Sequence, residues 1–324
     1  MIQPFHELTR AGKLRQLYGV AKAAVDMYEV DAAEVRLIST HTNFIYRVRT
    51  RDGMRYALRV GFPGWRTREN SIAETMWLDA LARDTEIPVP RVIRTPNGDA
   101  VLSVTTPFVP THYNVVMTSW LPGMLLGKHL TPQNCEKMGA LFAQLHIHSA
   151  SWQPPPGFPT QRFDRYLSRG EEERIFQSDT LNALSQTHTD TLLATRKEVS
   201  FAYHSFDQAD LRVIHCDLWH DNIKVHRGTL APFDFEDTIW GFRLHDLAMA
   251  LLDLEEDASP NIYPRLLDAF QHGYTRHLSW PEGNLVTLQH GRRLWRLNWV
   301  ARFQPDALPD AVAAAVTKFE KSIH

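Results

Sequence analysis

The sequence predicts an α+β protein in which the first 120 residues build a small antiparallel sheet and the remainder is mainly helical. Two observations carry this prediction. Between residues 34 and 60 apolar and polar side chains alternate with a period of two, and Arg51-Asp-Gly53 interrupts the alternation like a hairpin turn. After residue 130 apolar residues instead recur every three or four positions over long segments, which is typical of amphipathic helices.

Composition is that of a soluble globular protein large enough for two cores. The chain has 324 residues, of which 44% are hydrophobic and 22% charged, and its net charge is -2. We therefore expect no nucleic-acid and no membrane partner, while the oligomeric state stays open. Residues 1–7 lack the pattern of a secretory signal and no stretch reaches the length of a membrane span, so we expect a cytoplasmic protein. Cys135 and Cys216 are not spaced for zinc, and we expect reduced thiols.

The N-terminal elements can be placed from periodicity and turn residues. Pro88 and Pro90 mark an extended connector over 87–93, because proline excludes helix and biases the preceding residue towards extended angles. The expected elements are a helix over 8–28, strands within 34–48 and 56–60, an amphipathic helix over 71–81, and strands over 101–104 and 113–117. We place the boundary between the two parts near residues 121–123, which gives ranges 1–120 and 121–324.

The C-terminal part reads as a series of helices. Thr131-Pro132 is a cap residue followed by proline and begins a helix that runs to residue 148. His146 and His148 lie on this helix, but positions two apart point in different directions, so we do not expect them to share a metal. The further expected helices cover 163–167, 181–195, 247–254, 263–277 and 285–303. Trp295 and Trp299 could line a substrate pocket or pack in the core.

The strongest chemical signal is a polar loop between two short apolar runs in residues 213–225. The loop holds Asp217 and Asn222, and an alternating segment soon afterwards delivers Asp234. Carboxylate and amide oxygens that converge in this way suit Mg²⁺. Phosphoryl transfer needs a carboxylate that orients the attacking hydroxyl and oxygen ligands for the metal, so Asp217 suits the first role and Asn222 and Asp234 the second. Alternatively, these residues only form turns in an ordinary hairpin.

Two motifs resemble a known family. The spacing His-x-Asp-Leu-x-x-x-Asn from His215 to Asn222 resembles the kinase catalytic loop, and residues 233–248 resemble the "D-F-acid-acid…G…D-L-A" run of the aminoglycoside phosphotransferase and choline kinase superfamily. Glu236 stands where protein kinases usually have glycine. The run 117–123, ending in Leu-Pro-Gly, is similar to the hinge of that superfamily. The resemblance covers nearly the whole chain and implies a protein-kinase-like fold, with a nucleotide-binding lobe over 1–120 and a catalytic and acceptor-binding lobe over 121–324.

The resemblance also implies roles for individual residues and the cofactors ATP and Mg²⁺. Arg59 occupies the position of the usual phosphate-binding lysine, and Glu74, or alternatively Glu69, would pair with it. Arg59 could instead be an ordinary exposed strand residue. The remaining implied residues are Asn43 in the loop over the nucleotide, Thr118 and Trp120 beside the adenine, and His215 and Asp246 as supports of the catalytic loop. Trp120 could equally belong to the core.

The resemblance implies transfer of the ATP γ-phosphate to a hydroxyl of a small molecule. Acidic residues near the motifs would favour a cationic acceptor such as an aminoglycoside or choline, although homoserine or a sugar is also possible. The acids in question are Glu236, Asp237, Asp253, Glu255, Glu256 and Asp257. Two alternatives stay open. One is a Ser/Thr protein kinase of the same superfamily, and the other is a nucleotide-binding pseudokinase, which the arginine at position 59 and the glycine-free loop 39–43 would favour.

Overall fold

The computed structural model describes residues 7–40, 42–107, 109 and 111–320. The chain divides into two compact units. Unit 1 comprises Met1–Met124, Trp152–Pro159 and Lys224–Thr238, and unit 2 comprises Leu125–Ser151, Thr160–Ile223 and Ile239–His324. The first break therefore falls after residue 124, whereas the sequence suggested 120, and two later segments return to unit 1.

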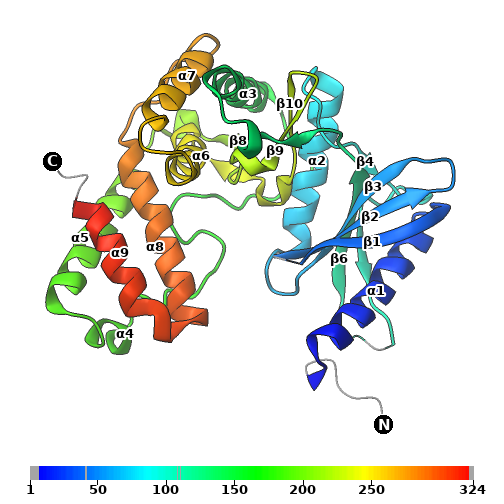
Figure 1. The fold of residues 1–324 in the computed structure, drawn as a ribbon, viewed down its shortest axis with the longest axis horizontal. Helices are drawn as coiled ribbons and strands as arrows, with labels where there is room; N and C mark the ends of the chain where they lie inside the picture. Colours follow the sequence, from blue (N-terminus) through cyan, green and yellow to red (C-terminus); the bar gives the residue numbers. More distant parts are fainter. Residues whose placement is uncertain (1–6, 41, 108, 110, 321–324) are drawn as a thin grey trace. The chain divides into compact units, whose positions relative to one another are not determined.

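Unit 1 contains the predicted antiparallel sheet, with one helix, α1 (Arg10–Met27), packed beside it (Figure 1). The strands are β1 (Ala32–Thr40), β2 (Asn43–Thr50), β3 (Arg55–Gly61), β4 (Val92–Ile93), β5 (Val101–Val104) and β6 (Tyr113–Ser119). Their order is β1-β2-β3-β6-β4, and β5 also pairs with β6. Apolar residues that alternate along β2 and β3, such as Tyr46 and Leu58, are fully buried against α1, so the period of two has the expected cause.

The second helix of unit 1, α2 (Arg68–Asp84), begins before the predicted start at residue 71. Its beginning is fixed by Thr67 and Asn70, which form a reciprocal capping box in which each side chain accepts a hydrogen bond from the other residue's backbone N–H. This pairing satisfies two donors at the helix start. Asparagine takes the place that glutamate or glutamine usually has, which is why the sequence pattern missed it.

A later segment returns to unit 1 and carries one of the two motifs. Its elements are β9 (Ile223–His226), β10 (Thr229–Pro232) and the short 3-10 helix η5 (Phe235–Asp237), and β9 pairs with β10 and with β7 (Met124–Leu125). The aromatic rings of Trp77 in α2 and Phe235 in η5 meet edge to face with centroids 5.4 Å apart. This buried contact fixes the motif against α2.

The described part of unit 2 is mainly helical, with an irregular segment over residues 160–177. It also holds the strands β8 (Arg212–Ile214) and β11 (Ile239–Gly241), which pair antiparallel. The helices are α3 (Pro132–Ser151), α4 (Ser178–Asn182), α5 (Gln186–His204), α6 (Arg243–Asp257), α7 (Tyr263–Thr275), α8 (Leu285–Phe303) and α9 (Leu308–Glu320). Helices α3 and α7 pack closely because Gly139 and Gly273 stand at their contact. A Cβ atom on either glycine would come within 2 Å of a carbonyl oxygen of the other helix, at 1.9 and 1.8 Å respectively.

Three expectations for the helices need correction. Residues 163–167 are not helical. Phe163 donates its backbone N–H to the backbone oxygen of Trp240, so the segment begins beside strand β11 instead of in a helix. The helix expected over 181–195 is divided into α4 and α5, and Ser185 caps α5. Helix α9 was not predicted. In the part of the chain that the structure describes, no helix is both long and apolar enough to span a membrane.

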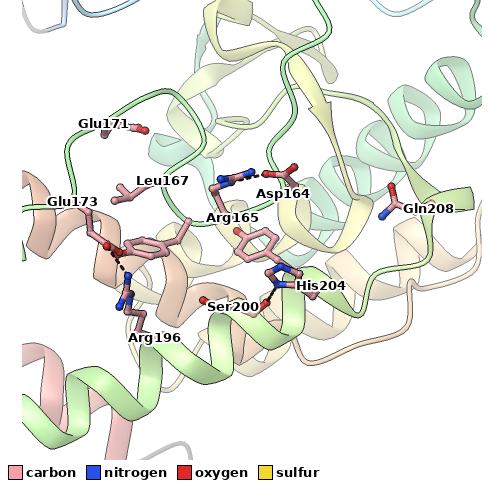
Figure 2. A pocket seen from close by; sticks show the side chains of 11 residues that line it. Asp164, Arg165, Leu167, Glu171, Glu173, Arg196, Ser200, His204 and Gln208 are labelled. Carbon is pink, nitrogen blue, oxygen red and sulfur yellow. Dashed lines mark hydrogen bonds and ion pairs between the residues drawn. The ribbon is translucent and has the colours of Figure 1, made fainter. Parts of the chain in front are cut away.

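A pocket of about 570 Å³ lies in unit 2, between the irregular segment that follows Phe163 and helix α5 (Figure 2). Tyr166 and Tyr203 supply its aromatic walls, and Glu171 and Glu173 line it from the irregular segment. Glu173 binds Arg196 at 2.6 Å and accepts the hydroxyl of Tyr166. The pocket is therefore mixed in character, with aromatic faces and charged groups together.

Candidate active site

The polar loop that follows β8 is not the tip of a hairpin. Strand β8 pairs with β11, whereas β9 pairs with β10 and β7, so the two strands that flank the loop do not pair with each other. A single 3-10 turn, η4 (His220–Asn222), ends the loop before β9. The alternative of an ordinary hairpin with turn residues is therefore wrong.

Within this loop the structure brings Asp217 and Asn222 together. The amide nitrogen of Asn222 donates to the backbone oxygen of Asp217 at 2.8 Å and to its carboxylate Oδ2 at 3.3 Å. The Asp217 side chain is 29% exposed and so remains accessible, whereas Asn222 is buried. Because the amide nitrogen makes both contacts with Asp217, the amide oxygen is the atom of the Asn222 side chain that can bind a hard cation.

A second partner of Asp217 comes from far along the sequence. Arg292 in α8 donates from Nη2 to Asp217 Oδ1 at 3.2 Å. No role for this arginine could be predicted from the sequence, because its contact depends on how α8 packs in unit 2. The only signal was a cluster of cations, Arg292, Arg293 and Arg296, on one helix.

Asp246 lies in the first turn of α6 and contacts the loop through the backbone of Cys216. Its carboxylate accepts the backbone N–H of Cys216 at 2.7 Å and lies 3.1 Å from His146 Nε2. Burial acts to raise the pKa of Asp246, but the hydrogen bond from His146 and the nearby His215 hold it below its ordinary value. The carboxylate is therefore ionised and fixes the residue immediately before Asp217.

His146 contacts Asp246 and Tyr274 inside unit 2. It is fully buried, and burial lowers its pKa, so the ring is neutral at pH 7. Since the ionised Asp246 can only accept, Nε2 carries the proton, and Nδ1 accepts from the hydroxyl of Tyr274 at 3.0 Å. His215, the other predicted support, is also fully buried at the end of β8.

A further histidine in this region was missed by the sequence analysis. His245 is 2% exposed, stacks on Phe163 with ring centroids 4.0 Å apart, and lies 2.8 Å from the hydroxyl of Tyr203. Its other nitrogen is 3.6 Å from the sulfur of Cys216. Burial lowers the pKa of His245 from 6.5 to about 3, so the ring is a neutral packing element. Cys216 itself adopts a left-handed backbone conformation with φ of 69°.

In unit 1 the predicted ion pair between Arg59 and Glu74 is present. Arg59 Nη1 donates to Glu74 at 2.8 Å, Nη2 donates to the second oxygen, and Glu74 is 3% exposed. Asp234 and Glu236 each lie 3.7 Å from the same guanidinium. Burial opposes the charge, but Glu74, Glu236 and Asp234 together raise the pKa of Arg59 above its ordinary value. Arg59 is thus a buried cation with three carboxylates around it, and not an exposed strand residue.

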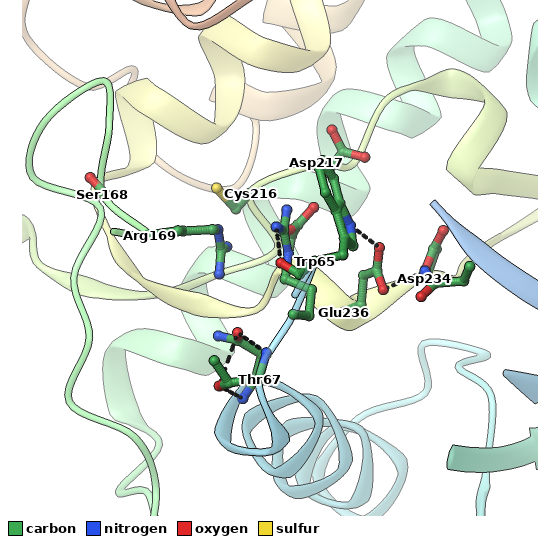
Figure 3. A network of polar contacts seen from close by, with 12 residues as sticks. Trp65, Thr67, Ser168, Arg169, Cys216, Asp217, Asp234 and Glu236 are labelled. Carbon is green, nitrogen blue, oxygen red and sulfur yellow. Dashed lines mark hydrogen bonds and ion pairs between the residues drawn. The ribbon is translucent and has the colours of Figure 1, made fainter. Parts of the chain in front are cut away.

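Glu236 gathers contacts from several segments of unit 1. It accepts the amide of Asn43 at 2.6 Å. It also accepts the indole N–H of Trp65 at 3.3 Å (Figure 3). The adjacent Asp237 pairs with Arg66, whose Nε lies 2.6 Å from the carboxylate. The sequence predicted Asn43 near the nucleotide, and the structure shows that its amide nitrogen holds Glu236.

The geometry of Asp234 differs from the expected alternating strand. Strand β10 ends at Pro232, and Asp234 has a left-handed backbone with φ of 63° before η5 begins. Aspartate tolerates this conformation better than most residues. The turn replaces the strand alternation and leaves the Asp234 side chain 38% exposed.

Thr118 and Trp120 lie where β6 ends. Thr118 pairs with Ala57 in the sheet, and the backbone N–H of Trp120 donates to Arg55 at 3.1 Å. The ammonium of Lys224 lies 4.5 Å from the Trp120 ring centroid and donates to the backbone oxygen of Leu121 at 2.8 Å. Trp120 is partly buried by this cation–π contact. Their predicted role beside adenine stays a prediction.

The acids that suggested a cationic acceptor are mostly paired within the protein. Arg296 holds Asp253 at 2.7 Å and Glu256 at 2.6 Å. Glu255 lies 3.8 Å from Arg293, and Asp257 lies 2.9 Å from His220. Arginines on α8 thus neutralise much of the negative charge of α6, which the sequence could not show. The cluster is no argument for a cationic acceptor.

Whether the predicted ligands suit Mg²⁺ depends on the donor atoms that Asn222 and Asp234 offer. Among the described residues no group of three or more His, Cys, Asp or Glu side chains is arranged to hold a metal. Magnesium does not need such a cage, because it usually keeps several waters and takes only one or two protein oxygens. The amide oxygen of Asn222 in unit 2 and the half-exposed carboxylate of Asp234 in unit 1 are of the type that magnesium prefers.

Comparison with known proteins gives consistent results at the level of family and fold. The model of the phosphotransferase enzyme family matches residues 34–281. Comparison with curated proteins finds no match. Among solved structures, the chain resembles an amicoumacin kinase in complex with AMP-PNP, Ca²⁺ and Ami, with 18% identity, 98% of this chain and 96% of that chain covered, and a TM-score of 0.77.

Two further structures have the same fold. A microcompartment-associated aminopropanol kinase shares 21% identity over 94% of both chains, with a TM-score of 0.73. A choline kinase from Cryptosporidium parvum Iowa II shares 14% identity over 89% of this chain and 88% of that chain, with a TM-score of 0.60. The predicted α+β, protein-kinase-like fold is confirmed. The family model covers well over half of the sequence, and the chain therefore belongs to the phosphotransferase enzyme family.

Proposed function

We propose that this phosphotransferase uses ATP and Mg²⁺ to phosphorylate a hydroxyl group of a small molecule in the cytoplasm. The observation that carries the proposal is the arrangement of Asp217 and Asn222, in which the amide nitrogen of Asn222 donates to the backbone oxygen of Asp217 at 2.8 Å and to its accessible carboxylate at 3.3 Å. This arrangement supplies one group for the acceptor and one for the metal.

Asp217 is the residue to which we assign the acceptor hydroxyl. Its carboxylate accepts the hydroxyl hydrogen and points the oxygen at the γ-phosphorus. Asn222 and Asp234 would provide protein oxygens to Mg²⁺, which when bound neutralises charge on the ATP phosphates. His215 and Asp246 keep the loop in place, because Asp246 holds the backbone of Cys216 at 2.7 Å.

The nucleotide is assigned to residues of unit 1. We assign Arg59, steadied by Glu74, to the phosphates, Asn43 to the loop that covers them, and Thr118 and Trp120 to the adenine. The buried Arg59–Glu74 pair supports the first assignment, since a cation must be held in a fixed position to act on phosphate. The backbone at the end of β6 supports the last, because adenine is bound there through backbone groups in kinases.

For the acceptor we propose an amino alcohol. The structures similar to this one are described as kinases of amicoumacin, aminopropanol and choline. We assign the acceptor to the pocket of about 570 Å³ in unit 2, whose volume suits a small molecule. Its walls include Tyr166 and Tyr203, which offer aromatic faces, and Glu171, which offers a carboxylate.

A second candidate function is ATP binding without transfer. The observation that favours it is that Glu74, Asp234 and Glu236 surround Arg59. These carboxylates pair with the guanidinium that the ATP phosphates would need. Against this function stands Asp217, because a module that only binds ATP has no need of an accessible carboxylate in the catalytic loop. A protein kinase of the same superfamily is the third possibility.

The test is transfer of labelled phosphate from Mg-ATP into a panel of amino alcohols, aminoglycosides, sugars and peptides. We expect incorporation into an amino alcohol or aminoglycoside, and a loss of about 1000-fold in the Asp217→Asn variant. Asn keeps the shape of the side chain but accepts no proton. Tight ATP binding with no incorporation in any acceptor would replace the transferase with the binding module, and labelling of peptides alone would replace it with the protein kinase.

A further inference from the structure

Arg292 of α8 contacts the catalytic loop at Asp217. Membership of the phosphotransferase family does not account for this contact. Arg292 lies 75 residues after Asp217 in the chain, and its Nη2 is 3.2 Å from Asp217 Oδ1. Both side chains are partly exposed, at 25% for Arg292 and 29% for Asp217. The pair thus lies where an acceptor hydroxyl that reaches Asp217 would meet it.

The two oxygens of the Asp217 carboxylate are held by different donors. Oδ1 accepts from Arg292 at 3.2 Å, and Oδ2 faces the amide nitrogen of Asn222 at 3.3 Å. Two donors on two oxygens fix the rotation of the carboxylate about its last bond, which a single donor would leave free. Each oxygen has a second lone pair, so an acceptor hydroxyl can still donate to the carboxylate.

Arg292 is itself held by its neighbours. Its guanidinium carbon lies 4.7 Å from the ring centroid of Trp295, one turn further along α8. The indole N–H of Trp295 donates to Glu171 Oε1 at 3.1 Å, and Glu171 lines the pocket of unit 2. A chain of contacts therefore runs from the pocket wall through Trp295 and Arg292 to Asp217.

The segment that carries Glu171 is fixed to the same helix. The buried side chain of Asn298 accepts the backbone N–H groups of Arg174 and Ile175 at 2.7 and 3.0 Å, and donates to the backbone oxygen of Glu172 at 2.9 Å. These bonds hold the segment against α8. The position of Glu171 relative to Trp295 is thereby set by backbone contacts as well as by side chains.

We infer that Arg292 is a positioning residue for phosphoryl transfer, which orients the Asp217 carboxylate towards the acceptor hydroxyl. The inference rests on the proposed function, because it needs Asp217 to be the residue that receives the acceptor. In this role Arg292 acts through its contact with the Asp217 carboxylate.

The neighbouring arginines of α8 supply a matched control. Arg296 lies four residues further on and is paired with Asp253 and Glu256 of α6 at 2.7 and 2.6 Å, rather than with the catalytic loop. Its side chain is 38% exposed. If transfer activity falls because α8 loses a positive charge, it should also fall in an Arg296 variant. If it falls because Asp217 loses its donor, the Arg296 variant should keep its activity.

The experiment compares Arg292→Met, Arg292→Lys and Arg296→Ala in the phosphate-transfer assay, with thermal unfolding recorded for each. Methionine keeps an aliphatic stem over Trp295 but removes the donor, and lysine keeps a charge that can reach Asp217. We expect Arg292→Met to lower kcat by about 10- to 100-fold, with the KM for ATP changed less than about twofold. Lysine should recover part of the loss, and Arg296→Ala should match the wild type.

The outcomes separate this inference from the proposed function. Wild-type transfer that Asp217→Asn abolishes but Arg292→Met leaves unchanged overturns the positioning role alone. A fall in kcat that lysine does not recover, or that Arg296→Ala shares, also overturns it, since the effect then belongs to the helix. If the wild type transfers phosphate to no acceptor, both the function and the inference fail.

Discussion

Two buried charges, one in each unit, are stabilised in different ways. Arg59 in unit 1 has three carboxylates around it, with Glu74 in direct contact and Asp234 and Glu236 at 3.7 Å. Asp246 in unit 2 is held by two specific donors, the backbone N–H of Cys216 at 2.7 Å and His146 at 3.1 Å. Arg59 therefore keeps other opposite charges nearby if one carboxylate is removed, whereas each of the two described donors of Asp246 is needed.

The difference teaches how much each partner matters. A charge with several opposite charges nearby keeps most of its stabilisation when one of them is removed, because Coulomb attraction falls off slowly with distance. A charge held by directed hydrogen bonds leaves its donors buried and unsatisfied when it is removed. The number of ion pairs in a region is therefore a poor guide to its sensitivity.

The largest effect is expected for Asp246→Ala. We expect the free energy of unfolding to fall by about 3–5 kcal/mol, because the buried donors of Cys216 and His146 both lose their acceptor. Urea unfolding at pH 7 measures it. Asp246→Asn keeps one oxygen for Cys216 and should lose less. A loss below about 1 kcal/mol in the alanine variant would show that Asp246 does not stabilise the loop through these contacts.

Glu74→Ala tests the redundancy in unit 1. We expect a smaller loss, about 1–3 kcal/mol, because Arg59 keeps Asp234 and Glu236 at 3.7 Å. The same unfolding measurement applies, with Glu74→Gln as the variant that preserves volume. If Glu236→Gln is added to Glu74→Ala, the combined loss should exceed the sum, since each acid compensates for the other. Simple additivity would show that the second acid does not compensate.

The pH dependence of stability sharpens the description of unit 2. The pKa of His245 falls from 6.5 to about 3 on folding because the ring is buried. A depressed histidine pKa contributes stability that is complete above pH 6.5 and is lost as pH falls towards 3, since the unfolded chain binds the proton first. We expect about 1.4 kcal/mol of loss per pH unit from this residue below pH 6.5.

The measurement is urea unfolding of the wild type and His245→Gln at pH 7.5 and at pH 5.5. Glutamine removes the titration, so the variant should lose less stability between the two pH values, whatever its stability at pH 7.5. Equal pH slopes in the two proteins would show that His245 does not titrate as its burial predicts.

The smallest effect is expected for Arg296→Ala. Its contacts with Asp253 and Glu256, at 2.7 and 2.6 Å, are as short as those of the buried groups, but the side chain is 38% exposed. Water replaces such partners, so we expect a loss of about 0–1 kcal/mol that shrinks at high salt. A loss comparable to that of Glu74→Ala would mean that geometry, rather than burial, decides the strength of these pairs.

The sequence determined the fold class and much of the candidate site by itself. Alternation in residues 34–60 predicted the strands because each lies with one face on a buried core, and helical spacing predicted α3 and α8 for the same reason. Two motifs in order predicted Asp217 and Asn222, which lie close together because they are only five positions apart. The Arg59–Glu74 pair follows from the resemblance and is present in the structure.

Only the tertiary structure decided the contacts between distant segments. The pairing of Arg292 with Asp217, of Glu236 with Asn43, and the neutralisation of the α6 acids by α8 each join residues 38 or more positions apart. No periodicity or spacing specifies such partners, because they depend on which faces of two elements pack together. The left-handed turn at Asp234 was missed for a related reason, since the alternation Pro-Phe-Asp-Phe suits a strand locally and the packing of Phe235 on Trp77 favours the turn.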